Sequence, residues 1–459
     1  MTLKFGTSGL RGLVTDMTSS QVARYTRAFL AACDLGEGLY VGYDLRASSP
    51  RIAEDVIAAA RQSGVRVTAC GAVPTPALAL AARQARAAAV MVTGSHIPAD
   101  RNGLKFYSRS GEITKEDETA IQAMLAEEIQ QNTDQNALLE TDAGVNARYA
   151  ERYISAFGTG ALTGRRIGLY AHSAVGRDVL GEILAALGAE VVDLGRSAEF
   201  IPVDTEAVAA DTRAQIAEWV RAHRLDALVS TDGDSDRPLL ADETGAIVPG
   251  DILGQITAQM LGAEVVVTPI SSNSGVLQNG FDAVRLTRIG SPFVIAGMEA
   301  AGDARVVGYE ANGGFLLGFD AQGPAGPLAA LPTRDCTLPL LAVLWAAGTG
   351  FVSARVAQEP PVCTRADRLQ EIPTEQSAAW LAELRETAAA RAEFLAAFGQ
   401  EEAGLDLTDG LRMALAGGGV VHLRPSGNAP EMRVYVEAES ASMADRLIAA
   451  ALAQVRQAL

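Results

Sequence analysis

Hydrophobic and polar residues follow one pattern three times along the first three quarters of the chain. In the first copy, residues 39–43 form an apolar run, and apolar residues recur at helical spacing over 49–64, where Ser49 before Pro50 predicts the N-cap of a helix. A second apolar run at 65–69, an alanine-rich stretch at 76–86 and a third apolar run at 88–92 complete this copy. Short apolar runs predict buried strands, and the helical spacing predicts amphipathic helices. The first copy therefore predicts the order β-α-β-α-β.

The same order returns twice further along the chain. The second copy predicts three strands and two helices, and the third predicts three strands, a short turn or helix and one longer helix. Units of this kind favour parallel sheets covered by helices. We therefore expect an α/β fold with three similar β-α-β-α-β domains whose sheets are mixed or parallel. The predicted elements are strands at 166–171, 190–194, 226–230, 264–268, 283–287 and 304–309, helices at 176–187, 212–223 and 292–301, and a short turn or helix at 275–281.

The last quarter of the chain has a different pattern. Two predicted strands, 420–424 and 432–438, surround a polar loop, and an amphipathic helix follows them. Charged helical stretches at 375–396 precede these strands. We expect a smaller C-terminal α+β domain here, which closes over a central cleft. The four expected domains span residues 1–150, 151–250, 251–365 and 366–459.

Each third strand of the repeated unit ends in a loop that is rich in glycine and in reactive polar side chains. These loops are residues 93–96, 231–237 and 310–314. Open α/β sheets bind ligands at the carboxyl ends of their strands. Ordinary polar turns explain any one of these loops, but they do not explain three at the same topological place. We therefore expect the three loops to form walls of one central cleft.

Three carboxylates stand within five residues of the second loop, at Asp232, Asp234 and Asp236. Carboxylate oxygens at this density suit Mg²⁺, because they repel one another unless a cation is present. An EF-hand requires glycine at the sixth position, where this chain has Arg237, and a helix where this chain has an apolar strand. A solvated acidic turn is the remaining alternative. We expect one Mg²⁺ per chain at the three carboxylates.

Ser95 lies between a glycine and a histidine at the end of a predicted strand. Its hydroxyl is a candidate nucleophile, although a turn-forming serine is the usual explanation of such a motif. Lys105 lies a few residues downstream and is a candidate for moving a proton. His96 is the second candidate for this role, and orienting a phosphate or a neighbouring group is the alternative role.

The loop that begins at Arg424 carries the groups that hold a phosphate dianion. A guanidinium fork, a hydroxyl, an amide and a glycine-exposed backbone occur together there, with a second arginine nearby. A polar turn with incidental arginines is the alternative. The candidate residues are Arg424, Ser426, Gly427, Asn428 and Arg433.

The chain has 459 residues, 48% of them hydrophobic, and a formal net charge of −17. This charge argues against nucleic acid and membranes as partners, so a site for an anionic substrate requires local arginines, lysines and a metal. The apolar stretches are shorter than the roughly 20 residues of a membrane-spanning helix, and residues 1–5 contain no apolar signal core. The four cysteines are scattered, which favours reduced thiols over a zinc site. We expect a cytoplasmic protein that is a monomer or a homodimer.

Six segments of the chain together resemble the α-D-phosphohexomutase superfamily, which includes phosphomannomutases, phosphoglucomutases and phosphoglucosamine mutases. The resemblance extends over essentially the whole chain, in the family's order and spacing. It implies four domains around a central cleft. The segments are FGTSGLRG (5–12), VGYDLRASS (41–49), TGSHIPADRNGLKFY (93–107), TDGDSDRP (231–238), YEANGG (309–314) and RPSGNAPEMRVYVEA (424–438).

The resemblance also implies a role for each candidate residue. Ser95 would carry a phosphoryl group, and a phosphoserine oxygen would bind Mg²⁺ together with the carboxylates of Asp232, Asp234 and Asp236. A hexose 1,6-bisphosphate would be the intermediate and the activator. The groups implied in proton transfer and charge are Lys105, His96, Arg11 and Arg237, and those implied in binding the phosphosugar substrate are Glu310, Asn312, Arg288, Gly290, Arg424, Ser426, Gly427, Asn428 and Arg433.

The implied function is the interconversion of hexose 6-phosphate and hexose 1-phosphate through a phosphoserine enzyme. Segment 172–178 is similar to a subgroup of bacterial phosphomannomutases, which favours mannose phosphate. Phosphoglucomutase and phosphoglucosamine mutase are the alternatives within the superfamily. A phosphatase that uses the same serine and a non-catalytic phosphosugar-binding regulator are alternatives of other classes. The loops depart from the usual family pattern at Gly94, Ile97, Asn312, Gly314, Asn428 and Ala429.

Overall fold

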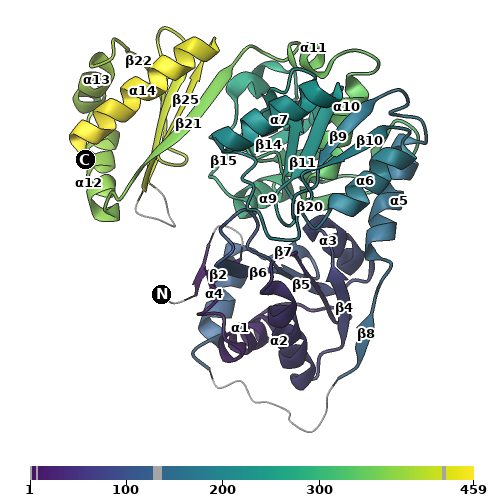
Figure 1. Ribbon diagram of the computed structural model, residues 1–459. Coiled ribbons are helices and arrows are strands. Elements are labelled where there is room, and N and C mark those ends of the chain that lie inside the picture. The colour runs from purple at the N-terminus through teal and green to yellow at the C-terminus, as the bar shows by residue number, and fades with distance from the viewer. Residues whose placement is uncertain (1–2, 7–8, 128–136, 426–430) are drawn as a thin grey trace.

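The computed structural model describes residues 3–6, 9–127, 137–425 and 431–459 (Figure 1). Within these residues, three large sheets combine parallel and antiparallel strands, a fourth large sheet is entirely antiparallel, and residues 321–322 and 327–328 form a small two-stranded antiparallel sheet. Helices pack against the four large sheets. The mixed α/β fold expected from the sequence is confirmed.

The N-terminal sheet has the strand order β1-β2-β6-β5-β3-β4-β8 in the described residues, with β7 beside β6. Apolar side chains of α1, α2 and α4 pack on one face of this sheet, and those of α3 pack on the other. The strands are β1 (Lys4–Phe5), β2 (Leu10–Leu13), β3 (Leu39–Tyr43), β4 (Val67–Ala72), β5 (Ala88–Val92), β6 (Arg101–Ser108), β7 (Gly111–Glu112) and β8 (Leu139–Thr141), and the helices are α1 (Ser19–Ala32), α2 (Ser49–Gln62), α3 (Thr75–Gln84) and α4 (Lys115–Met124).

The second sheet has the order β10-β9-β11-β12-β13, and its three parallel strands match the second predicted unit. Its last two strands run antiparallel to their neighbours. The elements are α5 (Val145–Phe157), β9 (Arg166–Tyr170), α6 (Arg177–Ala186), β10 (Glu190–Leu194), α7 (Ala210–His223), β11 (Ala227–Thr231), β12 (Pro238–Ala241) and β13 (Ile247–Val248).

The third sheet has the order β15-β14-β16-β17-β20, again with three parallel strands followed by antiparallel ones. Its elements and those that flank it are α8 (Gly250–Met260), β14 (Val265–Pro269), the 3-10 helix η1 (Ser274–Gln278), β15 (Ala283–Thr287), α9 (Ser291–Glu299), β16 (Val306–Tyr309), β17 (Phe315–Leu317), β18 (Ala321–Gln322), β19 (Pro327–Leu328), β20 (Leu331–Asp335), α10 (Thr337–Ala346) and α11 (Val352–Val356).

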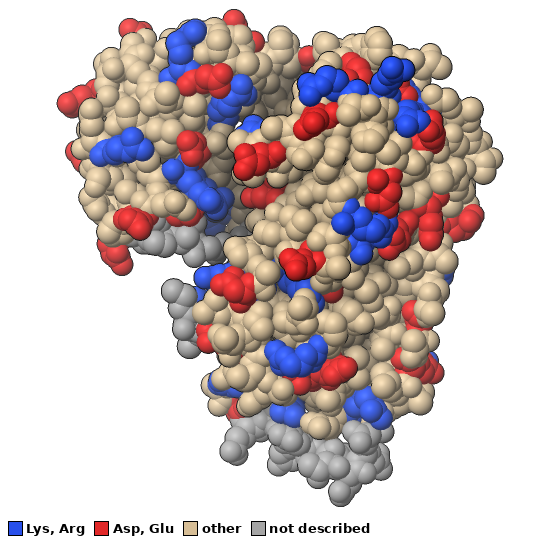
Figure 2. Space-filling view, in the orientation of Figure 1, with Lys and Arg blue, Asp and Glu red and all other residues tan. Residues whose placement is uncertain are grey.

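The C-terminal sheet is antiparallel, in the order β21-β25-β24-β23-β22. In Figure 1 its long helix α14 lies across one face of it, and Figure 2 shows a groove between this part and the rest of the molecule. The elements are β21 (Cys363–Gln370), α12 (Thr374–Glu386), α13 (Ala388–Ala396), β22 (Glu402–Asp406), β23 (Leu411–Leu415), β24 (Val420–Pro425), β25 (Glu431–Ala438) and α14 (Ala441–Ala458).

The three mixed sheets share one topological feature that places the predicted loops. In each sheet the third parallel strand of the unit turns directly into an antiparallel neighbour, as β5 into β6, β11 into β12 and β16 into β17. The loops at these turns begin at Thr93, Asp232 and Glu310. All three loops therefore leave from the carboxyl end of an equivalent strand.

One local prediction is wrong at the start of α2. The helix begins at Ser49, with Ser48 as its N-cap residue, so Ser49 is not the cap that its position before Pro50 predicts. The Ser49 hydroxyl instead donates a hydrogen bond to Asp44 Oδ1 at 2.6 Å. The side chain that the pattern assigns to capping is used to hold an acidic residue at the end of β3.

Buried apolar side chains form one continuous cluster that extends through all three mixed sheets, from α3 through α5 and α6 to α8 and α10. The C-terminal sheet has a separate apolar cluster, made by residues between Leu369 and Val455. Because the C-terminal part does not share the common core, it has fewer apolar contacts that resist a rigid-body movement. In the described residues, no helix is both long and apolar enough to cross a bilayer.

We propose the four-domain division with boundaries slightly different from those expected. The expected boundaries near residues 150, 250 and 365 fall inside α5, at the start of α8 and inside β21. Domain junctions normally lie in exposed connecting segments rather than within a helix or strand. We therefore propose junctions in the loops before these elements, at residues 142–144, 249 and 357–362.

Candidate active site

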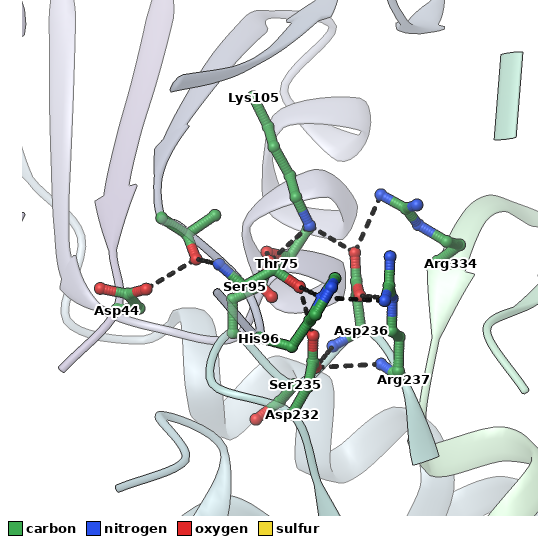
Figure 3. A network of polar contacts seen from close by, with 12 residues as sticks. Asp44, Thr75, Ser95, His96, Lys105, Asp232, Ser235, Asp236, Arg237 and Arg334 are labelled. Carbon is green, nitrogen blue, oxygen red and sulfur yellow. Dashed lines mark hydrogen bonds and ion pairs between the residues drawn. The ribbon is translucent and has the colours of Figure 1, made fainter. Parts of the chain in front are cut away.

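The serine loop (residues 93–96) and the aspartate loop (residues 231–237) meet although they are far apart in the sequence. Ser95 Oγ donates a hydrogen bond to Asp232 Oδ2 at 2.5 Å, and both side chains are buried (Figure 3). Ser95 follows β5, and Asp232 follows β11 in a different sheet. The candidate nucleophile is therefore in direct contact with the first of the three candidate metal ligands.

The backbone of Ser95 adopts a conformation that is unusual for a residue with a side chain. Its φ angle is 55°, in the left-handed region. The Ser95 N–H donates to Thr93 Oγ1 at 2.8 Å, and the Thr93 hydroxyl donates to Asp44 Oδ2 at 2.6 Å. Surrounding contacts must over-determine such a strained conformation, and this happens most often at functional sites.

Arg46 fixes the serine loop through hydrogen bonds to its backbone. Its guanidinium is buried, forms a salt bridge with Asp44 at 3.2 Å and lies 3.9 Å from the centre of the Phe200 ring. Four donor–acceptor contacts of 2.6–2.9 Å fix the loop backbone. The carbonyl oxygens that accept them belong to Ser95, Ile97, Pro98 and Arg101. No role was predicted for Asp44 and Arg46, although their place just after a parallel strand was a usable signal.

The three aspartates form the acidic cluster that the sequence predicts. Their ligand oxygens lie within 4.8 Å of one another, and all three side chains are buried. Asp234 Oδ1 and Asp236 Oδ1 are buried without a hydrogen-bond partner among the described residues. Burial and the two neighbouring carboxylates raise the pKa of Asp232 well above its ordinary value. Buried carboxylate oxygens without hydrogen-bond partners, at this density, fit a hard divalent cation such as Mg²⁺.

The aspartate loop approaches the serine loop so closely that one position must be glycine. A Cβ atom on Gly233 would lie 2.7 Å from the carbonyl oxygen of Ser95 and 2.9 Å from the Phe200 ring. On the other side, the Thr75 hydroxyl at the start of α3 donates to Asp234 Oδ2 at 2.5 Å. The N-terminal and second sheets are therefore locked together at the site.

Several cations surround the acidic cluster. Lys105 Nζ lies 2.5 Å from both Asp234 Oδ2 and Asp236 Oδ2. Arg334 Nη2 lies 3.1 Å from Asp236 Oδ2. Burial and the nearby guanidinium groups lower the pKa of Arg11 to about 10. Cations brought this close to one another favour the binding of a further anion between them.

Arg237 is a further cation of the site, and its charge affects both Arg11 and His96. The largest neighbouring influences on Arg11 are Arg237 and Arg334. Arg237 Nη1 also lies 2.9 Å from His96 Nδ1, so the histidine nitrogen accepts and the imidazole carries its proton on Nε2. Burial, together with Arg237 and Arg11, lowers the pKa of His96 to about 2. His96 is therefore neutral throughout the physiological pH range.

The loop after β16, residues 310–314, carries the candidate sugar ligands and is called the sugar loop below. Glu310 is buried, and its Oε2 accepts from Arg334 Nη1 at 3.3 Å. Asn312 Oδ1 accepts from the Gly314 N–H at 3.0 Å, and the Asn312 carbonyl accepts from the Thr205 hydroxyl at 3.1 Å. The Asn312 side chain thus stabilises its own loop, whereas the Glu310 carboxylate is held by a cation.

The predicted segment 288–290 lies at a different part of the third sheet. Arg288 is exposed, with its guanidinium 5.6 Å from the centre of the Phe293 ring. Gly290 is buried with a φ of 131° and precedes α9. The structure gives no contact between Arg288 or Gly290 and the aspartate cluster within the described residues.

Two predicted phosphate ligands are direct neighbours on the C-terminal sheet. Arg424 on β24 is opposite Arg433 on β25, and Arg433 is also opposite Arg368 on β21. Residues directly opposite across two strands point to the same face, where like charges destabilise the pair. A bound anion would relieve this repulsion. Three further candidates fall outside the described residues: Ser426, Gly427 and Asn428.

Sequence models of the phosphoglucomutase/phosphomannomutase family match the chain as α/β/α domain I at residues 2–132, α/β/α domain II at 147–245 and the C-terminal domain at 371–454. A phosphomannomutase of Sinorhizobium fredii (strain NBRC 101917 / NGR234) is 45% identical over 474 residues, with 99% of each chain covered. A phosphomannomutase of Salmonella muenchen is 42% identical, covering all of this chain and 96% of the relative.

The chain belongs to the phosphoglucomutase/phosphomannomutase family.

Solved structures agree in fold. A phosphoglucomutase/phosphomannomutase family protein from Burkholderia thailandensis superposes with a TM-score of 0.78 at 20% identity, covering 99% of this chain and 96% of that one. The phosphoglucomutase parafusin from Paramecium, in an open form, gives a TM-score of 0.71 at 15% identity, covering 99% and 95%. Family membership confirms the superfamily assignment made from the sequence motifs and identifies the chain as an isomerase of hexose phosphates.

In this family member, Asp409 links the candidate phosphate ligand Arg424 to the loop after β15. Asp409 Oδ2 accepts from Arg424 Nε and from the Ile289 N–H, each at 3.0 Å. The Asp409 carbonyl accepts from His422 Nε2 at 2.6 Å. No sequence signal singled out Asp409, because it lies in a short polar turn between β22 and β23. Segment 288–290 is thus tied to Arg424 through a side chain that the sequence analysis missed.

His422 makes the stability of this region depend on pH. Because Nε2 carries the proton that reaches Asp409, a second proton has to bind the buried Nδ1, which has no partner among the described atoms. Burial is the main cause that lowers the pKa of His422 to about 4, and Arg412 adds to it. Between pH 6.5 and about 4 the unfolded chain therefore binds more protons at this residue than the folded chain.

We expect the unfolding free energy of the C-terminal part to fall as the pH drops through this window. The contribution of His422 is up to about 1.4 kcal/mol per pH unit. Urea denaturation at several pH values measures the slope, and His422→Gln, whose amide keeps a donor for Asp409, should flatten it. His223→Gln at the end of α7 is the control. An equal slope in wild type and His422→Gln would contradict this explanation.

Proposed function

We propose that the protein interconverts mannose 6-phosphate and mannose 1-phosphate through a phosphorylated Ser95 and a mannose 1,6-bisphosphate intermediate. The observation that carries this proposal is the 2.5 Å contact between Ser95 Oγ and Asp232 Oδ2 inside the buried aspartate cluster. A hydroxyl in this position has a site for a charge-neutralising cation directly beside it. Phosphoryl transfer depends mainly on such positioning and charge neutralisation.

The chemistry at Ser95 consists of two reversible transfers. In the first, the bond between phosphorus and Ser95 Oγ breaks, and a bond forms to the free hydroxyl oxygen of the hexose monophosphate. In the second, the bisphosphate has turned over in the cleft, and Ser95 Oγ recovers the other phosphoryl group. The proton of the sugar hydroxyl leaves during the first transfer, and a proton returns to the product hydroxyl in the second.

Lys105 is the proposed proton carrier. Its Nζ lies beside the reacting hydroxyl loop and contacts Asp234 and Asp236. In this role it would take up the hydroxyl proton in the first transfer and return a proton in the second. His96 is neutral at neutral pH, because burial and Arg237 lower its pKa to about 2, so it does not act as an imidazolium acid. We assign His96 and Arg237 to orientation and Arg11 to charge stabilisation.

Asp232, Asp234 and Asp236, with an oxygen of the phosphorylated serine, are the proposed Mg²⁺ ligands. Bound Mg²⁺ would neutralise charge on the phosphoryl group as it moves. The chain's own contribution is to hold the three carboxylates together in a buried loop, with Gly233 and Thr75 fixing its approach to the serine loop. Because the chain has a net charge of −17, an anionic substrate needs positive charge placed locally, from Mg²⁺ and the surrounding lysine and arginine side chains.

The non-reacting phosphate is the proposed ligand of the C-terminal sheet. Arg424 and Arg433 stand opposite each other on β24 and β25, and Ser426, Gly427 and Asn428 would add a hydroxyl, backbone N–H and an amide. Arginine forks bind phosphate oxygens in pairs. Glu310 is the proposed acceptor of sugar hydroxyls, with Asn312, Arg288 and Gly290 shaping the surrounding loops.

Mannose is preferred as the sugar because of the named relatives. The two relatives at 42–45% identity are phosphomannomutases, whereas phosphoglucosamine mutases among the relatives are 28–29% identical. A hexose 1,6-bisphosphate is the proposed activator, and an N-acetylphosphoglucosamine mutase of Aspergillus fumigatus has been crystallised with glucose 1,6-bisphosphate. We propose a cytoplasmic enzyme that acts as a monomer or a homodimer, without nucleic acid or membrane partners.

A parallel turnover assay tests the sugar. The purified protein receives mannose 1-phosphate, glucose 1-phosphate or glucosamine 1-phosphate, each with Mg²⁺ and a catalytic amount of the matching 1,6-bisphosphate. We expect kcat/KM to be at least about tenfold higher for mannose 1-phosphate than for the other two. A higher value for glucose or glucosamine would overturn the choice of mannose. Stoichiometric release of inorganic phosphate would indicate a phosphatase, and binding without turnover would indicate a regulator.

A further inference from the structure

Arg334 is a buried cation that the proposed reaction does not use and that no sequence motif singled out. It lies on β20, and its side chain is 3% exposed. Its guanidinium lies 3.3 Å from Glu310 Oε2, 3.1 Å from Asp236 Oδ2 and 3.9 Å from Glu112 Oε1. Figure 3 shows it pointing from the third sheet toward Asp236. One side chain therefore contacts carboxylates from the sugar loop, the aspartate loop and the N-terminal sheet.

The sugar loop is built to let Arg334 reach this position. A Cβ atom on Gly314 would lie 2.9 Å from Arg334 Cδ, 3.0 Å from Cγ and 3.2 Å from Cβ. The aliphatic stem of the arginine thus occupies the space that a side chain at position 314 would need. The Glu310 N–H also donates to the Gly314 carbonyl at 3.2 Å, so the residue that makes room for Arg334 is bonded to the residue that Arg334 holds.

The strand that carries Arg334 is anchored on its opposite face. Asp335 is the next residue of β20, so its side chain points away from Arg334. Its carboxylate accepts hydrogen bonds from the hydroxyl groups of Tyr149 at 2.6 Å and of Tyr153, both on α5. All four side chains are buried. The guanidinium is therefore presented to the cleft from a fixed backbone.

The geometry points to Arg334 as a positioning residue for the sugar. We propose that its planar guanidinium holds Glu310 Oε2, so that the other carboxylate oxygen of Glu310 is directed at a ring hydroxyl of the hexose. The second contact, to Asp236, ties the sugar loop to the aspartate loop. This inference deepens the proposed function and rests on it, because the role of Glu310 as a hydroxyl acceptor belongs to that function.

Simple charge neutralisation is the competing explanation for Arg334. Glu310, Asp236 and Glu112 are buried carboxylates, and any cation placed between them offsets their repulsion. A lysine would serve that purpose. A lysine would not serve to orient Glu310 while also binding Asp236, because its ammonium is a compact point charge without the planar fork of arginine. Arg334→Lys therefore separates the two explanations.

The experiment measures how strongly the enzyme depends on each ring hydroxyl. The values of kcat/KM are determined for mannose 6-phosphate and for its deoxy analogues at ring positions 2, 3 and 4. We expect the wild type to lose at least about tenfold with the analogue that lacks the hydroxyl bound by Glu310, because a site built to bind a hydroxyl rejects its absence. In Arg334→Lys that loss should shrink to about threefold or less, for the same analogue.

Two further variants make the test independent of overall activity. Glu310→Gln should reduce the same hydroxyl dependence, and the double variant with Arg334→Lys should reduce it no further, because the two residues act as one unit.

Arg305→Lys, in an exposed pair with Glu264 in the same part of the chain, is the matched control and should keep the wild-type ratio. If Arg334→Lys does not fold, Gly314→Ala displaces the arginine stem and should give the same loss of hydroxyl dependence.

The outcomes distinguish this inference from the proposed function. If the wild type is active and the folded variants keep the wild-type ratio of kcat/KM between mannose 6-phosphate and its deoxy analogues, only the role of Arg334 is overturned. Additive effects in the double variant overturn it as well. If the wild type turns over no hexose phosphate, the dissociation constants of the same compounds, measured by calorimetry, replace kcat/KM in the comparison. If the wild type binds none of them, both proposals are overturned.

Discussion

Ser95→Ala is expected to abolish mutase turnover, with a fall in kcat of at least about 10⁴-fold. The substitution removes the only atom of the side chain that can carry the phosphoryl group between the two sugar positions. The lost hydroxyl also donates to Asp232, but the loop keeps the contacts of Arg46 with its backbone carbonyls. We therefore expect the fold to be retained. Turnover in a coupled assay and circular dichroism measure the two effects.

Ser108→Ala on β6 is a matched control for this substitution. Its hydroxyl donates to the Gly111 carbonyl and accepts from the Ser110 N–H, both in the neighbouring turn, so activity should stay near that of the wild type. If Ser95→Ala retained a substantial fraction of wild-type turnover, a phosphoserine could not be an obligatory intermediate, and the proposed mechanism would have to be discarded.

Asp232→Asn is expected to remove the response to Mg²⁺ while leaving the metal-free protein at least as stable as the wild type. Burial and the neighbouring carboxylates raise the pKa of Asp232, so its charge is unfavourable when no cation is bound. The amide removes that charge, its oxygen can still accept from the Asp236 and Arg237 N–H groups, and its NH2 group can donate to Ser95 Oγ. In the wild type, Mg²⁺ at one hundred times its dissociation constant should stabilise the fold by about 2.7 kcal/mol. Thermal unfolding with and without Mg²⁺ measures this difference.

Activity should follow the same pattern. EDTA is expected to stop turnover in the wild type, added Mg²⁺ should restore it, and Asp232→Asn should stay inactive at any Mg²⁺ concentration. Asp193→Asn, in an exposed pair with Arg196, is the control that should keep both responses. An Asp232→Asn protein that is stabilised by Mg²⁺ as strongly as the wild type would show that the cation binds elsewhere.

The sequence was sufficient to predict which loops meet. The repeated β-α-β-α-β pattern and the rule for the carboxyl ends of parallel strands placed Ser95 beside Asp232, although 137 residues separate them. Hydrophobic periodicity encodes this topology directly. The strands β3, β5, β10 and β15 begin and end at the predicted residues.

The supporting contacts were not predictable in the same way. Arg46 and Arg334 are single arginines, and only the structure shows that they are buried among carbonyl and carboxylate oxygens. Asp409 acts across two sheets, and the pairing of Arg424 with Arg433 depends on strand register. Burial also decides the state of His96, whose lowered pKa no local sequence pattern indicates.

Mass spectrometry of the protein after incubation with mannose 1,6-bisphosphate and Mg²⁺ tests the central claim most directly. The account predicts one phosphoryl group per chain, located on Ser95, which leaves the protein when mannose 6-phosphate is added and appears in the bisphosphate. A phosphoryl group on a different residue would contradict the account. So would a phosphoryl group on Ser95 that added mannose 6-phosphate does not remove.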